Sequence, residues 1–245
     1  EVYGSHLTMG GTIDDLVRIH TISREEQDEY ALRSQILAQK AIEEGKFKEE
    51  IVPYQVKQRK ETVSFKIDEH PRKTSLEALS SLRPVFTEGG TVTAGNSSGR
   101  NDGAAAVLVA GYDKAMELGL KPQLRIVTQA AAGVRPDQMG LGPVAATKKA
   151  LKQANLSIND IDLIEINEAF AGQTVVGIKE LGLDINKVNV NGGAIALGHP
   201  IGATGTILTI KLMNEMKRRG SKYGLVTLCI AGGLGISTIF EYIGQ

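Results

Sequence analysis

Apolar residues follow two different patterns along this chain of 245 residues, and the pattern changes near residue 100. In the first part, capping-box spacings that begin at Thr12 and Ser23 predict helices over about 12–20 and 24–44, the second ended by Gly45. Alternating apolar residues then suggest short strands before the periodicity is lost. We therefore expect the first part to be only partly regular.

The strand-like alternation lies between 51 and 67, and residues 68–99 after it have no periodicity. The second of these segments contains two prolines and a glycine-rich stretch. Structureless segments of that length are usually functional or mobile. We expect 68–99 to be a long irregular excursion.

From residue 101 onward, apolar stretches of strand length alternate with stretches of helical periodicity. The strands are expected at 104–110, 124–132, 161–166, 187–190, 223–230 and 234–241. The helices are expected near 113–118, 143–154, 168–181 and 202–219. This alternation predicts an α/β layered domain with a largely parallel sheet, closed by an adjacent strand pair at its C-terminal end.

Three side chains with chemical capability lie at the ends of predicted strands. Asn167, His199 and Cys229 each end or follow one of them, and glycines surround the last two. Ligands of open α/β sheets bind at the carboxyl ends of the strands. The three residues are therefore predicted to meet at one edge of one sheet.

Each of these residues also has a simpler interpretation. A lone cysteine in an apolar strand is usually a small buried hydrophobe, Asn167 is a suitable helix N-cap, and His199 could simply satisfy backbone groups. The three together favour an active site. In such a site, the positive end of the helix at 202–219 would keep the His199 ring neutral. Nearby backbone N–H groups would favour a Cys229 thiolate and could bind an oxyanion.

Charge and composition argue against several other functions. The chain has 28 basic residues (Lys and Arg) and 28 acidic residues (Asp and Glu), so its net charge is zero. No overall electrostatic field therefore favours binding to nucleic acid or to an acidic membrane surface. One cysteine excludes an intrachain disulfide framework and fits a reducing compartment. No apolar run approaches the length of a membrane span, and the first residues do not resemble a signal peptide. We expect a soluble protein of the cytoplasm.

Common ligand motifs do not fit this sequence. Gly193 and Gly198 have the spacing of a phosphate-binding loop, but His199 stands where that loop needs a lysine. No glycine fingerprint for dinucleotides occurs in the right context. One cysteine and four scattered histidines provide no zinc-ligand spacing. We expect neither a metal nor a resident cofactor.

The chain contains the segments ISREEQDEYALRSQ at 22–35, LRPVF at 82–86, GTVTAGNSSGRNDGAAA at 90–106, NEAFA at 167–171, VNVNGGAIALGHPIGATG at 188–205 and CIAGGLG at 229–235. These segments resemble the thiolase family, which joins or cleaves acyl-CoA thioesters at a carbon–carbon bond. The resemblance covers essentially the whole chain. It implies a thiolase-like layered αβα domain with a mixed, mostly parallel sheet, plus part of an irregular α+β loop domain.

The resemblance also implies a division of the chain. Residues 1–100 would be part of the loop domain that covers coenzyme A. Residues 101–120 would be a strand and helix of the N-terminal thiolase domain, and 121–245 the C-terminal thiolase domain. Thiolases use two cysteines, and this chain has one. We therefore expect a C-terminal part only, which lacks the N-terminal domain with the nucleophilic cysteine and is inactive alone.

The resemblance assigns roles to the residues at the strand ends. Cys229 would be the acid and base at the α-carbon of the substrate. His199 would activate the nucleophile and, with a water held by Asn167, form one oxyanion hole. The N–H of Ala231 would contribute to a second hole. These residue types suit the chemistry, because a thioester enolate needs fixed dipoles and a base tuned near neutrality.

Substrate-binding residues are implied in the same way. Ser98 and Ala94 would contact the pantetheine arm, and Arg72 would lie beside the adenine. The residues that would line or border the pocket are Met9, Phe86 and Phe170.

Within the family, the chain most resembles the acetyl-CoA C-acetyltransferases, which make acetoacetyl-CoA and CoA from two acetyl-CoA. Thr8 stands where short-chain biosynthetic members often carry histidine, so a degradative 3-ketoacyl-CoA thiolase is the alternative. Two alternatives belong to other classes of protein. One is a cysteine hydrolase that uses Asn167, His199 and Cys229, and the other is a non-catalytic CoA-binding module. Expected partners are acetyl-CoA, acetoacetyl-CoA and CoA, with no nucleic acid or membrane, in a full-length homodimer or homotetramer.

Overall fold

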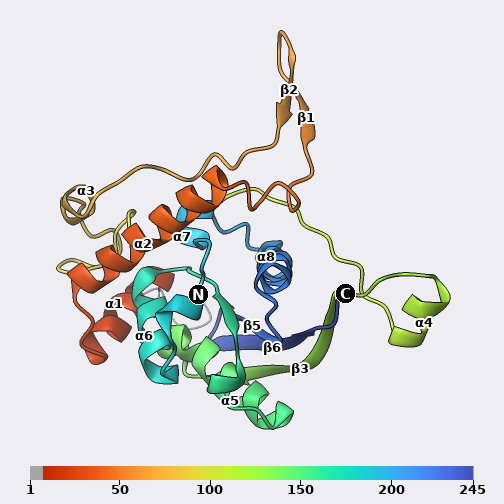
Figure 1. Ribbon diagram of the computed structural model, residues 1–245. Coiled ribbons are helices and arrows are strands. Elements are labelled where there is room, and N and C mark those ends of the chain that lie inside the picture. Colours follow the sequence, from red (N-terminus) through yellow and green to blue (C-terminus); the bar gives the residue numbers. More distant parts are fainter. Residues whose placement is uncertain (1–7, 245) are drawn as a thin grey trace.

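The computed structural model describes residues 8–244, and its main feature is one sheet between helices (Figure 1). The α-helices are α1 (Met9–Ile19), α2 (Arg24–Glu43), α3 (Leu76–Ser80), α4 (Tyr112–Glu117), α5 (Gly142–Ala154), α6 (Ala171–Leu181), α7 (Ala194–Leu197) and α8 (Thr204–Arg219). The strands are β1 (Tyr54–Lys57), β2 (Thr62–Phe65), β3 (Leu124–Gly133), β4 (Leu163–Ile166), β5 (Tyr223–Ile230) and β6 (Leu234–Tyr242). Three 3₁₀ helices are η1 (Pro136–Leu141), η2 (Ile158–Asp160) and η3 (Ile185–Lys187).

The central sheet has the strand order β3-β6-β5-β4. β4 and β5 are parallel, whereas β6 is antiparallel to both of its neighbours. Three strands therefore run one way and β6 runs the other, which confirms the predicted mixed sheet and its C-terminal strand pair. The pairing is less parallel than predicted, because the β5–β6 hairpin places β6 between β3 and β5.

Helices cover both faces of this sheet, as the layered prediction requires. In β4, Leu163 belongs to an apolar cluster with Leu208 and Leu212 of α8, whereas Ile164 belongs to a cluster with Ala150 of α5. Neighbouring residues of a strand point to opposite faces, so both faces of β4 are buried. Figure 1 shows α5 and α8 on opposite sides of the sheet.

The first two helices pack against α6 at the end of the sheet where the candidate residues lie. Ser23 caps α2 in the predicted capping box with Glu26. The first helix starts earlier than predicted, at Met9, because Thr8 and not Thr12 is its N-cap. The Thr12 hydroxyl instead donates to the Met9 carbonyl from within the helix.

The predicted strand at 104–110 does not form. The chain has no regular secondary structure there and pairs with no strand among the described residues, and Leu108 is 80% exposed. A strand needs a neighbour for its backbone N–H and C=O groups, so an apolar stretch alone does not make one. Of the predicted strand and helix at 101–120, only α4 is present, and it lies away from the sheet (Figure 1).

The predicted strand at 187–190 is reduced to one bridge between Ile164 and Val188. Asn189 has a φ of 44°, which stops an extended strand. Its side chain replaces the strand pairing, because Nδ2 donates to the Ile166 carbonyl (2.8 Å) and Oδ1 accepts from the Ile166 N–H (2.9 Å). The side-chain amide of Asn189 therefore takes the place of a neighbouring strand at Ile166, the last residue of β4.

The irregular segment 51–99 contains the predicted strands and one unpredicted short helix, α3. β1 and β2 form an antiparallel hairpin that projects from the molecule at the top of Figure 1. All eight residues of the two strands are exposed. Among residues 8–244, no helix has the length and apolar composition that a membrane span requires.

Two glycines let the start of α5 lie directly against β6. A Cβ at Gly235 would overlap the carbonyl of Gly142, and a Cβ at Gly142 would overlap the backbone of Leu234. This close approach sits opposite Cys229 in the β5–β6 register. The spacing of α5 and β6 thus depends on the absence of two side chains.

We expect Gly235→Ala to lower the free energy of unfolding by roughly 1–3 kcal/mol, because backbone atoms cannot yield to the added methyl group as a flexible side chain can. Urea unfolding of the variant and the wild type measures the loss. Gly111→Ala is the matched control, since a Cβ there meets nothing within 4 Å. Equal losses at the two positions would contradict the close-packing account.

Two buried titratable side chains, Glu165 of β4 and Lys211 of α8, lie near each other. Burial raises the pKa of Glu165 to about 8; nearby Lys211 opposes this rise and other carboxylates add to it. Glu165 Oε2 and Lys211 Nζ have no hydrogen-bond partner within 8–244. The ammonium of Lys211 lies 4.4 Å from the centre of the Phe47 ring. The folded protein therefore keeps Glu165 protonated at neutral pH.

Because the pKa of Glu165 is raised from 4.5 on folding, its stabilising contribution is complete below pH 4.5 and is lost as the pH rises to about 8. We expect Glu165→Gln to be more stable than the wild type at pH 8.5, by a few kcal/mol (on the order of 1.4 kcal/mol per pKa unit). The difference should shrink towards pH 4.5. Urea unfolding across this range measures it, with exposed Glu77→Gln as control. A pH-independent difference for Glu165→Gln would contradict the assignment.

Candidate active site

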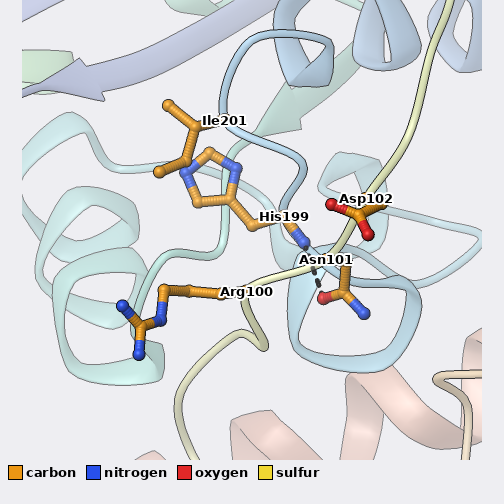
Figure 2. Close-up of a pocket in the computed structure, with 5 residues that line it drawn as sticks. All are labelled: Arg100, Asn101, Asp102, His199 and Ile201. Carbon is orange, nitrogen blue, oxygen red and sulfur yellow. Dashed lines mark hydrogen bonds between the residues drawn. The ribbon is translucent and has the colours of Figure 1, made fainter.

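His199 lies in the loop between α7 and α8, directly after Gly198, whose φ of 93° only glycine adopts readily. The backbone N–H of His199 points to the Gly99 carbonyl (3.2 Å) and to Asn101 Oδ1 (3.3 Å). Figure 2 shows the second of these bonds and the His199 ring on the other side of the backbone. The loop before α8 is thus fastened to the irregular segment near residue 100.

The hydrogen bonds of the ring define the tautomer of His199. Nδ1 lies 2.7 Å from the Thr204 hydroxyl, which donates its own proton to the Pro200 carbonyl (2.9 Å). The hydroxyl must therefore accept from Nδ1–H. Nε2 then carries a lone pair, and the Asn167 amide Nδ2 donates to it at 3.3 Å. The arrangement presents Nε2 as a proton acceptor.

Burial lowers the pKa of His199 below its ordinary value of 6.5. The direction agrees with the expectation of a neutral ring. The cause is desolvation of the imidazolium, whereas the sequence pointed to the positive end of the following helix. A neutral ring near pH 7 can act as a general base.

Asn167 follows β4, and its N–H continues the sheet pairing by donating to the Thr227 carbonyl (3.0 Å). It is not a helix N-cap, because α6 begins at Ala171 and Phe170 is the residue before it. Asn167 is buried, and its Oδ1 has no partner within residues 8–244. The simpler interpretation of this residue is therefore wrong.

Cys229 lies near the end of β5, where its thiol donates to Gln173 Oε1 of α6 at 3.8 Å. Burial raises the pKa of the thiol to about 11. The expectation of a stabilised thiolate is wrong for this structure, because desolvation outweighs the nearby backbone N–H groups. At neutral pH Cys229 is a proton donor.

The register of the sheet relates these residues. Ile166 pairs with Thr227 on neighbouring parallel strands, and Asn167 lies one residue beyond that pair whereas Cys229 lies two residues beyond it. His199 joins them through its hydrogen bond to Asn167. The structure thus brings two of the predicted residues into contact and places the third at the same edge.

Ala231 lies in the turn between β5 and β6, close to Cys229 in the chain. Gly232 and Gly233 give this turn its shape with φ values of 81° and 86°. Ala231 is exposed. Its role in an oxyanion hole stays a prediction.

Ser98 and Ala94 belong to the segment that packs beside Asn167. The N–H of Ser98 donates to the Ala169 carbonyl at 3.0 Å, and the neighbouring Ser97 pairs with Phe170. Ser98 is half-buried and Ala94 is exposed. The structure therefore places Ser98, one of the two predicted pantetheine-contacting residues, next to the NEAFA segment.

Phe86, Phe170 and Met9 are also close to one another. The rings of Phe86 and Phe170 meet edge to face, with centroids 5.9 Å apart. Phe86 covers Gly10, where any side chain would overlap its ring. Phe86 and Met9 remain more than 40% exposed, and their place in a substrate pocket stays a prediction.

Arg72 is separate from these residues. Its side chain is exposed and makes no ion pair or hydrogen bond within residues 8–244. Its backbone N–H is fixed by Gln35 Oε1 (3.1 Å). The prediction that Arg72 lies beside an adenine stays a prediction.

Sequence reasoning missed the residues that support the site. Thr204 orients the His199 ring, Gln173 accepts from Cys229, and Glu168 forms a buried hydrogen-bond network. Only Glu168 carried a signal, as an acidic residue two positions after a strand end. The other two are common helix residues whose roles depend on contacts distant in sequence.

A cavity of about 320 Å³ opens beside His199 and is lined by Arg100, Asn101, Asp102 and Ile201 as well (Figure 2). Two of these side chains are charged, with opposite signs. Within residues 8–244, no group of three histidine, cysteine or acidic side chains is placed to hold a metal ion.

Comparison with known proteins identifies the family. The family model described as the thiolase C-terminal domain matches residues 120–242, and that of the thiolase N-terminal domain matches residues 2–113. The chain belongs to the thiolase family. The expectation of a C-terminal part only is wrong, because the N-terminal model covers the irregular segment that the sequence suggested was a separate loop domain.

Individual thiolases are similar over most of this chain. It is 54% identical to an acetyl-CoA acetyltransferase of Syntrophomonas wolfei, over 95% of this chain and 59% of the relative. It is 50% identical to a 3-ketoacyl-CoA thiolase of Bacillus subtilis, over 96% of this chain and 63% of the relative. The chain thus spans less than two thirds of the length of these thiolases.

Solved thiolase structures share the fold. The crystal structure of the Bacillus anthracis acetyl-CoA acetyltransferase superimposes with a TM-score of 0.95 at 50% identity, covering 98% of this chain and 61% of that one. Human mitochondrial 3-ketoacyl-CoA thiolase in complex with CoA gives 0.90 at 46% identity, covering 97% and 59%. The thiolase fold predicted from the sequence is confirmed.

Proposed function

We propose that the protein is an acyltransferase that forms and cleaves the carbon–carbon bond between acyl-CoA thioesters, with two acetyl-CoA giving acetoacetyl-CoA and CoA. The hydrogen bond from Asn167 to His199 Nε2, at the same sheet edge as Cys229, carries this proposal. Membership of the thiolase family supports it. Relatives named acetyl-CoA acetyltransferase, at 51–54% identity, favour the acetyl substrate.

The resting state of Cys229 suits the first half of thiolysis. When the carbon–carbon bond of acetoacetyl-CoA breaks, the bonding electrons stay with the acetyl-CoA fragment as an enolate. The Cys229 thiol, protonated at neutral pH because its pKa is about 11, would give its proton to the enolate carbon. The resulting thiolate would then take the proton of the incoming CoA thiol, which restores Cys229.

His199 would act on the nucleophile and on the developing oxyanion. Its Nε2 lone pair would accept the proton of the attacking thiol, after which Nε2–H would donate to the thioester oxygen with a water held by Asn167. The N–H of Ala231 would face the oxygen of the second thioester. Cys229 is the only cysteine in these 245 residues, so the acyl-carrying thiol of the proposed reaction is not among them.

The alternatives differ in how well the geometry supports them. A 3-ketoacyl-CoA thiolase uses the same chemistry on longer chains, and the relative of that name at 50% identity favours it as the second candidate. A cysteine hydrolase needs a thiolate nucleophile, which a thiol with a pKa of about 11 does not supply near neutrality. A CoA-binding module without catalysis would leave the Asn167–His199 contact without a purpose.

Thiolysis of acetoacetyl-CoA by the natural full-length protein tests the proposal. We expect turnover with acetoacetyl-CoA and CoA, and a lower kcat/KM with a 3-ketoacyl-CoA of long chain. A preference for the long chain would establish the degradative alternative. Binding of CoA without any turnover would contradict the enzyme proposal. Light scattering of the same sample would test the expected homodimer or homotetramer.

A further inference from the structure

Glu168 directly follows the candidate-site asparagine and is fully shielded from solvent. Its carboxylate accepts four hydrogen bonds. Oε1 accepts from the Tyr30 hydroxyl (2.9 Å) and from Asn189 Nδ2 (2.8 Å). Oε2 accepts from the Ser34 hydroxyl (2.6 Å) and from the backbone N–H of Ile195 (3.1 Å). All four bonds come from neutral donors.

These donors belong to parts of the chain that are distant in sequence. Tyr30 and Ser34 are on α2, whereas Asn189 and Ile195 belong to the segment that leads to His199. The carboxylate also lies against the backbone of that segment, because a Cβ at residue 193 would overlap it. One side chain therefore joins α2, the end of β4 and the loop before α8.

We propose that Glu168 is a positioning residue for acyl transfer, which holds Asn167 and the segment before His199 at the separation that their hydrogen bond requires. This inference rests on the proposed function. Asn167 is the preceding residue in the chain, so rotation of the Glu168 backbone would move its amide. His199 is four residues beyond Ile195, after one turn of α7 and Gly198. Loss of the Glu168 bonds would therefore disturb both partners of the catalytic contact.

Glutamine cannot replace Glu168, although it has the same shape. Its amide nitrogen donates and must face one pair of partners. On one side it would oppose Asn189 Nδ2, whose amide cannot turn because both its ends are bonded to Ile166. On the other side it would oppose the N–H of Ile195, which donates only. Either orientation leaves two donors facing each other in the interior, which costs free energy.

The test is Glu168→Gln in the natural full-length protein, with Glu165→Gln as the matched control. The control has the same buried residue type three positions earlier, but it faces α8 and has no bond to the loop. We expect Glu168→Gln to lower kcat roughly 10- to 100-fold, because small displacements of catalytic groups have effects of that size. We expect KM to change less than roughly threefold, since the contact acts on the chemical step. Glu165→Gln should keep the wild-type kcat at neutral pH.

The titration of His199, followed by NMR of its ring, separates positioning from folding. The chain has four histidines, so the signal can be assigned with a His199→Asn sample. We expect the His199 pKa in folded Glu168→Gln to move back towards 6.5, because the ring leaves its buried place. Unchanged kcat and unchanged titration in a folded Glu168→Gln would overturn the proposal. A lower melting temperature with both values unchanged would also overturn it.

Ser34→Ala is the second variant, for the case in which Glu168→Gln does not fold. It removes one of the four donors and leaves the carboxylate in place, so we expect the same changes at smaller size. If the kcat and the His199 pKa of Ser34→Ala both equal those of the wild type, the proposal is contradicted. If the wild-type protein itself turns over no acyl-CoA, the proposed function fails. The His199 titration in the variants would still decide whether Glu168 positions the ring.

Discussion

Replacing His199 with asparagine is expected to lower kcat for thiolysis of acetoacetyl-CoA by roughly 10²- to 10⁴-fold, the usual contribution of a positioned acid or base. The ring presents an Nε2 lone pair because Thr204 takes the Nδ1 proton, and asparagine has no group that accepts a proton near neutrality. Steady-state kinetics of the natural full-length variant measures the loss. The kcat/KM of the wild type should also fall as the pH drops below the pKa of His199, because protonation of the ring removes the base. That pKa lies below 6.5.

His20→Asn is the control for this substitution. His20 is at the end of α1 and pairs with Glu180 (3.3 Å), away from the strand ends. We expect this variant to retain wild-type kcat. Activity of His199→Asn within threefold of the wild type would show that the ring does not take part in proton transfer.

The second large effect is expected for Cys229→Ser, with a loss of kcat of roughly 10²- to 10⁴-fold. Serine has nearly the same shape, but its hydroxyl is a far weaker acid than a thiol and does not exchange protons with an enolate at neutral pH. The kcat values of the variant and the wild type measure the effect. A serine variant with wild-type kcat would contradict the acid and base role.

The protonation state of Cys229 can be measured independently. Burial raises the pKa of the thiol to about 11, so alkylation by iodoacetamide should be slow at pH 8 and should rise until about pH 11. These 245 residues contain no other cysteine, which makes the alkylation of Cys229 easy to identify by peptide mapping. An alkylation midpoint near that of free cysteine, about 8.5, would contradict the buried-thiol account.

Much of the fold could be predicted because its signals are local. The capping box at Ser23 and the strand expected at 161–166 depend on neighbours in sequence, and both are confirmed, the strand as β4 (Leu163–Ile166). The strand expected at 104–110 failed because strand formation needs a partner that local periodicity cannot reveal. The strand expected at 187–190 failed because the Asn189 side chain took over the pairing with Ile166.

The candidate site shows the same limit. Sequence patterns placed Asn167, His199 and Cys229 at strand ends, and the sheet register brings those ends to one edge. The tautomer of His199 depends on Thr204, and the state of Cys229 depends on burial against α6, which no spacing rule expresses. The thiolate expected from nearby glycines was wrong for that reason.

The central claim is that Cys229 exchanges a proton with the α-carbon of an acyl-CoA thioester. The direct measurement is incorporation of deuterium into the methyl group of acetyl-CoA, followed by mass spectrometry after incubation with the natural full-length protein in D₂O. We predict incorporation with the wild type and background exchange with Cys229→Ser. Incorporation at the wild-type rate by Cys229→Ser would contradict the account.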